Sequence, residues 1–209
     1  MGFYDRYILP RVLDLACGAP PIRKQREKVV PNAHGRVLEV GVGSGLNLPH
    51  YDMSRVEALI GLDPSPELRR LAERRAHEAK IDVEWLALEA ERIPLDDASI
   101  DSIVITYTLC TIGDTAAALS EMRRVLKPGG ELYFSEHGRA PDAAVARWQD
   151  RLTPYWKKLA GGCELNRDIP GMLRAAQFEL VELDTMYVPQ TPRFAGHMFW
   201  GRARPAGER

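Results

Sequence analysis

The chain has 209 residues, of which 45% are hydrophobic, enough for one well-filled α/β core and few for two independent domains. Its 28 basic and 29 acidic side chains leave a formal net charge of −1, so no overall field attracts nucleic acid, and we expect no nucleic-acid partner. The three cysteines, Cys17, Cys110 and Cys163, lack the CxxC spacing of zinc or redox sites, which predicts free thiols and no metal. No apolar run approaches the roughly 20 residues that span a bilayer, and no signal pattern is present, so we expect a cytoplasmic protein without stable membrane insertion.

From residue 36 onward, short β-branched runs alternate with helical patterns, which is typical of repeated βαβ units around a parallel sheet. The first five predicted strands are 36–40, 58–63, 83–88, 101–106 and 131–136. The predicted helices among them are 66–79 and 115–126. A Lys-Pro-Gly-Gly turn at 127–130 ends the second helix.

The last third of the chain predicts helices at 142–159 and 169–176, followed by strands at 179–186 and 197–203. The short connection between these two strands suits an antiparallel pair better than a crossover. We therefore predict a Rossmann-like α/β fold. Its seven-stranded sheet is mostly parallel, with one antiparallel strand and helices on both faces.

Two segments before the sheet, 4–17 and 22–30, also look helical, with Pro10 dividing the first. We interpret the whole chain as a single domain made of a helical lid at 1–31, a cofactor-binding half at 36–137 and a substrate-side half at 138–209. The lid is expected to cover the end of the sheet.

A glycine-rich turn follows the first predicted strand. Gly41, Gly43 and Gly45 alternate along it, so the backbone can bend sharply and approach a ligand with no Cβ in the way. The dinucleotide fingerprint GxGxxG needs glycine at position 46, which is Leu46. A GxGxG turn after an acidic residue, here Glu39, is instead the form that enzymes using S-adenosylmethionine (SAM) share. An ordinary strand–helix turn is the alternative interpretation.

Asp63 ends the second predicted strand, 18 residues after Gly45. A carboxylate there points into the crevice where neighbouring strand ends diverge, and it can accept the ribose hydroxyls of an adenosine. The alternative is that Asp63 caps the helix at 66–79, although Ser65 is equally placed for that task. After the third strand, Glu89 or the backbone of Ala90 is expected to contact adenine. The predicted cofactor-binding residues are Glu39, Gly41, Gly43, Gly45, Asn47, Asp63, Pro64, Ser65, Glu89, Ala90, Thr106 and Leu109.

With these residues, the chain resembles class I SAM-dependent methyltransferases. It is most similar to the methyltransferase-like seven branch, whose human members methylate alkyl thiols. The matching segments are 38–45, 63–66, 109–110, 124–130, 133–137 and 162–167. The ubiquinone and menaquinone C-methyltransferases are similar too, but less so over the last 70 or so residues. The animal proteins carry an apolar N-terminal membrane segment that this sequence lacks, which implies a soluble, bacterial-type relative.

The substrate side is expected after the fifth strand. We predict His137 as the base or thiolate partner, with a structural role fixed by Glu136 or backbone carbonyls as the alternative. The predicted substrate-pocket residues are Tyr4, Tyr7, Cys110, Trp148, Trp156, Cys163 and Arg167. Each of the tryptophans is alternatively plain core, and Arg167 a surface residue. A weaker hypothesis is that the apolar N-terminal set docks on a membrane surface.

The sequence thus predicts an enzyme that transfers a methyl group from SAM to a small hydrophobic acceptor, a thiol first and a quinone-like or amine/phospholipid acceptor next. S-adenosylhomocysteine would be the product. A non-catalytic SAM-binding regulator is the rival that is not an enzyme, and an oxidoreductase is disfavoured by Leu46. We expect a monomer or a homodimer.

Overall fold

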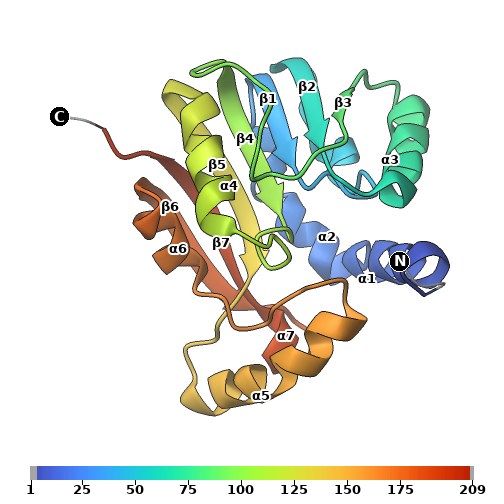
Figure 1. Cartoon of the computed structure of the whole chain (residues 1–209), viewed down its shortest axis with the longest axis vertical. Helices are drawn as coiled ribbons and strands as arrows, with labels where there is room; N and C mark the ends of the chain where they lie inside the picture. The colour runs from blue at the N-terminus through green and yellow to red at the C-terminus, as the bar shows by residue number, and fades with distance from the viewer. Residues whose placement is uncertain (1–3, 208–209) are drawn as a thin grey trace.

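The predicted strands form one seven-stranded sheet in the order β3-β2-β1-β4-β5-β7-β6 (Figure 1). The computed structural model describes residues 4–207. The strands are β1 (Gly35–Val40), β2 (Val56–Leu62), β3 (Glu84–Leu86), β4 (Ile100–Thr106), β5 (Leu126–His137), β6 (Phe178–Tyr187) and β7 (His197–Pro205). Strands β1 to β5 pair in parallel, whereas β7 runs antiparallel to both β5 and β6. The predicted mostly parallel sheet with one reversed strand is therefore confirmed.

Helices cover both faces of the sheet and the carboxyl ends of its central strands (Figure 1). The helices are α1 (Leu9–Cys17), α2 (Pro20–Arg26), α3 (Pro66–Ala79), α4 (Thr115–Val125), α5 (Ala143–Leu159), α6 (Ile169–Ala175) and the short α7 (Arg193–Gly196). Single turns of irregular helix lie at η1 (Tyr4–Ile8), η2 (Val30–Asn32) and η3 (Leu48–His50). None of the helices in the described part of the chain is long and apolar enough to cross a membrane.

The N-terminal segment differs from its predicted form in detail. The helical run is divided next to Pro10, as predicted, but the boundary lies between Ile8, which ends η1, and Leu9, which begins α1, so that Pro10 occupies the first turn of α1. The second helix covers Pro20–Arg26 instead of 22–30, because a proline pair starts it earlier and Pro31 forces a separate turn after it.

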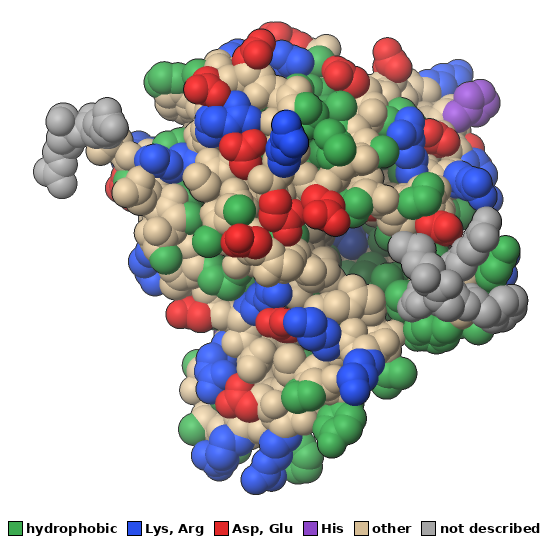
Figure 2. All heavy atoms as spheres, in the orientation of Figure 1, with side chains coloured by type: hydrophobic (Ala, Val, Ile, Leu, Met, Phe, Trp, Pro, Cys, Tyr) green, Lys and Arg blue, Asp and Glu red, His purple; other side chains and the backbone are tan. Residues whose placement is uncertain are grey.

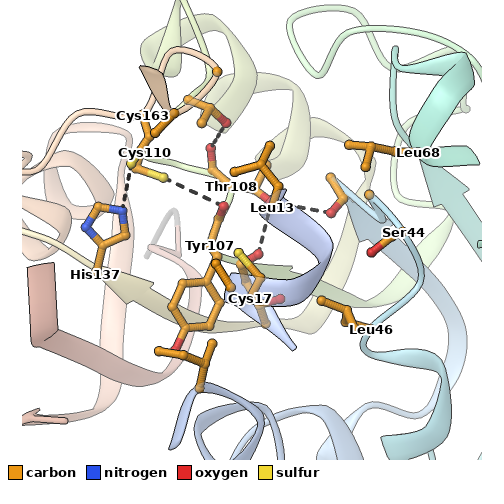
Figure 3. Close-up of a pocket in the computed structure, with 18 of the residues that line it drawn as sticks. Leu13, Cys17, Ser44, Leu46, Leu68, Tyr107, Thr108, Cys110, His137 and Cys163 are labelled. Atoms are coloured by element: carbon orange, nitrogen blue, oxygen red, sulfur yellow. Dashed lines mark hydrogen bonds between the residues drawn. The ribbon is translucent and has the colours of Figure 1, made fainter. Parts of the chain in front are cut away.

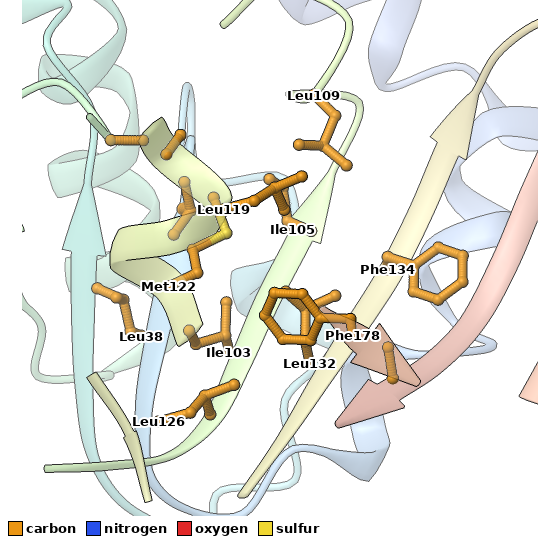
Figure 4. Close-up of a cluster of buried hydrophobic side chains, with 14 of the residues drawn as sticks. Leu38, Ile103, Ile105, Leu109, Leu119, Met122, Leu126, Leu132, Phe134 and Phe178 are labelled. Atoms are coloured by element: carbon orange, nitrogen blue, oxygen red, sulfur yellow. The ribbon is translucent and has the colours of Figure 1, made fainter. Parts of the chain in front are cut away.

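The core is split between the two faces of the sheet because successive side chains of a strand point to opposite sides. Leu38, Ile103 and Phe134 pack on one side with Leu119 and Met122 of α4 (Figure 4). On the other side, alternate residues of the same strands pack with the segment after α2 and with α3. Burial on both faces explains why the central strands have nearly continuous apolar sequences.

Ser65 begins α3 by accepting a hydrogen bond from the Leu68 amide on its side-chain oxygen. Asp114 caps α4 in the same way, through the Ala117 amide. These caps fix where each helix leaves the loop at the carboxyl edge of the sheet. The loops that lead into α3 and α4 are therefore fixed at the ends where these helices begin.

Candidate active site

A cavity of about 810 Å³ lies at the carboxyl ends of β1 and β4. These two strands are neighbours in the sheet but not in the sequence, and their outgoing loops diverge to opposite sides, as at the ligand-binding edge of open α/β sheets. Figure 2 shows a hollow with hydrophobic side chains on its walls, between the sheet and the part of the chain that carries α5. The glycine turn lines one end of the cavity and the segment after α5 lines the other.

The glycine turn has the backbone that only glycine adopts without strain. Gly41, Gly43 and Gly45 have φ values of 73°, 53° and 79°. A Cβ on Gly41 would overlap the side chain of Thr108, which follows β4. Asp63 fixes the turn, since its Oδ2 accepts a hydrogen bond from the Gly43 amide at 2.8 Å. The cavity therefore has a wall of bare backbone at the place where the sequence predicted a cofactor.

Ser65 and not Asp63 caps α3, as the sequence suggested, whereas Asp63 lines the cavity. The Oδ1 atom of Asp63 accepts from the Ser65 amide at 2.8 Å, and Ser65 itself caps α3 and does not line the cavity. Burial raises the pKa of Asp63 above its ordinary value, while hydrogen bonds from Ser65 and Gly43 oppose the rise. Asp63 thus presents a half-buried carboxyl group to the cavity, and Pro64 lines it beside Asp63.

A buried polar network stands behind the glycine turn. Glu39 accepts hydrogen bonds from Asn47 Nδ2 at 3.0 Å and from the Tyr51 hydroxyl at 2.7 Å. Arg26, from the end of α2, donates to Thr106 Oγ1 at 2.6 Å and to Asn47 Oδ1 at 3.2 Å. Its Nε atom is buried without a hydrogen-bond partner among the described residues. The network thus places the cation of Arg26 on the cavity wall, where its Nε–H group is available to a ligand.

Arg26 is a charged residue of the cavity wall that sequence reasoning missed. It is only 4% exposed and lines the cavity, with its guanidinium carbon 4.8 Å from the centre of the Tyr107 ring. A basic residue at the end of a helix is usually a solvated one, so its position in the sequence carried no signal. Only the return of α2 over the end of β4 brings it into the site.

Replacing Glu39 by glutamine is expected to change how stability depends on pH. Burial raises the pKa of Glu39 to about 7 from 4.5, although hydrogen bonds from Tyr51 and Asn47 and the charge of Arg26 lower it. The folded state therefore holds this proton more tightly than the unfolded state, so wild-type stability falls from about pH 4.5 to about pH 7 and is then level. Glutamine does not titrate, so the stability of the Glu39→Gln variant lacks this decline. Thermal melts from pH 5 to 8 should show a melting-temperature difference, variant minus wild type, that grows with pH. A difference that does not change with pH would contradict this.

Three side chains meet at the far end of the cavity (Figure 3). His137 Nε2 lies 3.2 Å from Cys163 Sγ, and these two atoms and Cys110 Sγ all lie within 4.8 Å of one another. All three residues line the cavity. Hydrogen bonding from Cys110 and His137 lowers the pKa of Cys163, and the contact with Cys163 raises the pKa of His137 against the effect of burial. Two sulfurs and an imidazole are also atoms that a metal ion accepts as ligands.

Glu136, beside His137 in sequence, points away to the backbone. Its two carboxylate oxygens accept from the Thr108 amide at 2.8 and 3.1 Å. Burial raises its pKa to about 7, and the bonds from Thr108 and Leu109 lower it. The carboxylate therefore fixes the turn after β4, which carries Cys110.

Most of the predicted site residues line the cavity. They are Glu39, Gly41, Gly43, Asn47, Asp63, Pro64, Glu89, Ala90, Thr106, Cys110, His137, Trp156 and Cys163. The predicted lid contributes Leu13, Asp14, Ala16 and Cys17 of α1 to the lining of the cavity, and its role as a lid stays a prediction.

Some predicted residues lie elsewhere. Gly45 packs against Leu48 and Ala72, and Leu109 is part of the buried core (Figure 4). Tyr4, whose hydroxyl donates to the Leu159 carbonyl, and Tyr7 are exposed beside the cavity and do not line it.

Trp148 and Arg167 also need correction. Trp148 is 57% exposed on the outer surface of α5, because its neighbour Gln149 takes the buried position. Arg167 donates to the carbonyls of Leu109 and Ile112. Its side chain therefore holds the loop around Cys110 and does not line the cavity.

Comparisons with known proteins agree with this geometry. Residues 38–134 match the family described as "Methyltransferase domain". The chain is 34% identical over 169 residues to thiol S-methyltransferase TMT1B of Homo sapiens, covering 78% of this chain and 68% of that protein. It is also 34% identical over 167 residues to phosphatidylethanolamine N-methyltransferase of Cereibacter sphaeroides, covering 79% and 77% of the two chains. The chain spans 62% of the length of the rat thiol S-methyltransferase TMT1B.

Solved structures share the fold. A SAM-dependent methyltransferase of Leishmania major superposes with a TM-score of 0.70 at 15% identity, covering 96% of this chain and 80% of that one. Geranyl diphosphate methyltransferase in complex with SAM gives a TM-score of 0.68 at 12% identity, covering 87% and 84%. The sequence matches to the family and to the two relatives, together with the glycine turn, Asp63 and the sheet order, show that the chain belongs to the class I SAM-dependent methyltransferases.

Proposed function

We propose that the protein transfers the methyl group of SAM to the sulfur of a small hydrophobic thiol. One observation carries the proposal: the glycine turn with Asp63 and the Cys110–His137–Cys163 cluster line a single, largely apolar cavity. The first half suits an adenosyl cofactor, and the second suits a sulfur nucleophile. The thiol S-methyltransferase relatives support this choice of acceptor.

In this proposal the cofactor lies along the carboxyl edge of the sheet. Asp63 binds the ribose hydroxyls, and Glu89 with the Ala90 backbone contacts adenine. The methionine part lies over Gly41 and Gly43, with its carboxylate toward Arg26. The transferable methyl then points to the end of the cavity that Cys110 and His137 line.

Methyl transfer from a sulfonium is an in-line displacement, so the main tasks are to align the nucleophile with the methyl and to exclude water. The acceptor sulfur forms the new bond to the methyl carbon while the bond from that carbon to the cofactor sulfur breaks. The products are a methyl thioether and S-adenosylhomocysteine. A thiol attacks as its thiolate, and the charged form is disfavoured in an apolar cavity. His137 is the group at this end that can promote loss of the thiol proton.

A phospholipid amine or a quinone-like molecule is the second candidate acceptor. The phosphatidylethanolamine N-methyltransferase relative favours the amine, and the apolar cavity walls fit either one. A non-catalytic regulator would have no need of the second half of the cavity. The cytoplasmic location and the monomeric or dimeric state stay predictions.

Titration calorimetry and a turnover assay test the proposal together. We expect SAM and S-adenosylhomocysteine to bind, and NAD to bind far more weakly, because the turn lacks the third glycine of the dinucleotide motif at Leu46. Alkyl thiols should then be methylated faster than quinols or phosphatidylethanolamine. Tighter binding of NAD would contradict the methyltransferase assignment. Turnover of an amine or quinol alone would replace the acceptor and keep the reaction.

The Arg26→Gln variant is expected to bind SAM about tenfold more weakly, since a hydrogen bond between charged groups contributes roughly 1.5 kcal/mol or more. The affinity for 5′-methylthioadenosine, which has no carboxylate, should change little. This ligand is the matched control, because a variant that merely disturbed Asn47 and Thr106 would bind both ligands more weakly. Equal losses for the two would assign Arg26 a structural role.

A further inference from the structure

We propose that Cys110, His137 and Cys163 bind one zinc ion and that its fourth coordination position takes the acceptor sulfur. The metal-binding part stands on the arrangement of these three residues alone. The acceptor part rests on the proposed thiol methylation. The cysteine spacing did not indicate such a site, because the three ligands lie 27 and 26 residues apart in the sequence.

The three ligand atoms have nearly the separations that zinc needs. With zinc bonds of about 2.3 Å to sulfur and about 2.0 Å to nitrogen, a tetrahedral ion holds its ligand atoms about 3.5–3.8 Å apart. Here Cys110 Sγ, Cys163 Sγ and His137 Nε2 all lie within 4.8 Å of one another, and the nitrogen is 3.2 Å from Cys163 Sγ. To bind zinc, the most widely separated pair of ligand atoms has to approach by about 1 Å.

The backbone segments that carry the ligands are tied together. Cys110 follows β4, His137 ends β5 and Cys163 follows α5. The Glu164 amide donates to the Cys110 carbonyl at 2.9 Å, and Arg167 donates to the adjoining carbonyl of Leu109. Three separate parts of the fold thus bring their ligand side chains together. The hydrogen bonds between these segments hold the side chains close to one another.

Charge and coordination number both suit a reactive zinc site. Two thiolates neutralise Zn²⁺, so the ion is acceptable in the apolar end of the cavity. Three protein ligands leave one position open, which is the pattern of catalytic zinc, whereas structural zinc is held by four. The open position faces the cavity, because all three ligands line it.

An acceptor thiol can use this position to reach its reactive form. The thiol displaces a water molecule, releases its proton to solvent and binds zinc through sulfur as a thiolate at neutral pH. That sulfur then attacks the methyl carbon of SAM. The resulting thioether is neutral and a weaker ligand, so it dissociates with S-adenosylhomocysteine. Under this proposal His137 promotes thiolate formation by holding the metal.

The test measures zinc directly, on the full chain without a histidine tag. We expect about one zinc per chain by elemental mass spectrometry after gel filtration, and a strong loss of zinc in Cys110→Ser and Cys163→Ser. The Cys17→Ser variant is the matched control, because Cys17 lines the same cavity but stands outside the cluster. It should retain the metal.

Cobalt substitution keeps the test independent of how the serine variants fold. Wild-type protein loaded with Co²⁺ should show the absorption of a tetrahedral thiolate complex, and an alkyl thiol should change that spectrum. Removing zinc with a chelator should lower thiol methylation about tenfold or more, while the affinity for S-adenosylhomocysteine stays the same.

The possible results separate the two proposals. A metal-free protein that still methylates thiols overturns the zinc site and keeps the proposed function. Zinc content that is equal in wild type and both serine variants also overturns it. Zinc bound at the cluster without turnover of any thiol keeps the metal site and rejects thiol methylation. A disulfide between Cys110 and Cys163 in protein purified in the presence of a reductant would count against the metal as well.

Discussion

Replacing His137 by alanine is expected to lower turnover of an alkyl thiol by about 100-fold or more at neutral pH, which is the usual effect of losing a group that assists proton loss. His137 is the only imidazole among the described residues that line the cavity. An alkyl thiol has an ordinary pKa near 8.5, so few molecules are thiolate at neutral pH without help. The affinity for SAM should be nearly unchanged, since Asp63 and the glycine turn lie at the other end of the cavity.

The pH dependence of turnover by the His137→Ala variant tests whether His137 helps to form the thiolate. The defect should be largest at low pH and should shrink as the pH rises toward the pKa of the acceptor thiol, because the thiol then ionises without help. His77→Ala is the control, since His77 is exposed on α3 and does not line the cavity. Parallel pH–rate profiles for wild type and the His137 variant would show that His137 has no part in forming the thiolate.

Replacing Asp63 by alanine is expected to raise the dissociation constant for SAM and S-adenosylhomocysteine by about 10- to 100-fold. A carboxylate that accepts ribose hydroxyls contributes roughly 1.5–3 kcal/mol, which corresponds to that range. Because Asp63 also accepts hydrogen bonds from the amides of Gly43 and Ser65, we expect a modest loss of stability as well, since those donors lose their partner.

A second variant separates binding from stability at this position. Asp63→Asn keeps one acceptor oxygen for the loop amides and removes the charge, so it should melt closer to wild type and still bind the cofactor more weakly. Asp82→Ala, at an exposed position before β3, is the matched control. Isothermal titration and thermal melts measure the two effects. An unchanged dissociation constant in both Asp63 variants would move the ribose contact to another residue.

The cofactor half of the site was predictable because it depends on local sequence. The alternating glycines need positive φ, which no other residue adopts cheaply, and Asp63 ends a strand whose apolar pattern is plain. Parallel strands bring their carboxyl ends to one edge of the sheet, so two motifs that each follow a strand must lie near each other. The mostly parallel sheet with one reversed strand followed from the same patterns, whereas the order of the strands came from the structure.

The tryptophans predicted for the acceptor half were less accessible to sequence reasoning, because they come from a helix whose rotation is set by packing. Trp148 and Trp156 lie two turns apart on α5, yet the first is exposed and the second lines the cavity. Nothing in their spacing fixes which face of the helix turns inward. The outcome depends on Gln149, which is buried and donates to the carbonyls of Gly138 and Phe194.

By itself, the sequence determined the class of fold, the glycine turn and the position of Asp63, since each of these follows from local backbone preference and the two-residue period of strands. Only the tertiary structure decided that Arg26 enters the cavity and that the ligand atoms of Cys110, His137 and Cys163, each predicted for the substrate side, lie next to one another. These residues come from separate elements, and their distances are set by how the helices pack on the sheet. Contacts of that kind leave no periodic pattern along the chain, which is why spacing alone gave no indication that the three side chains form a cluster.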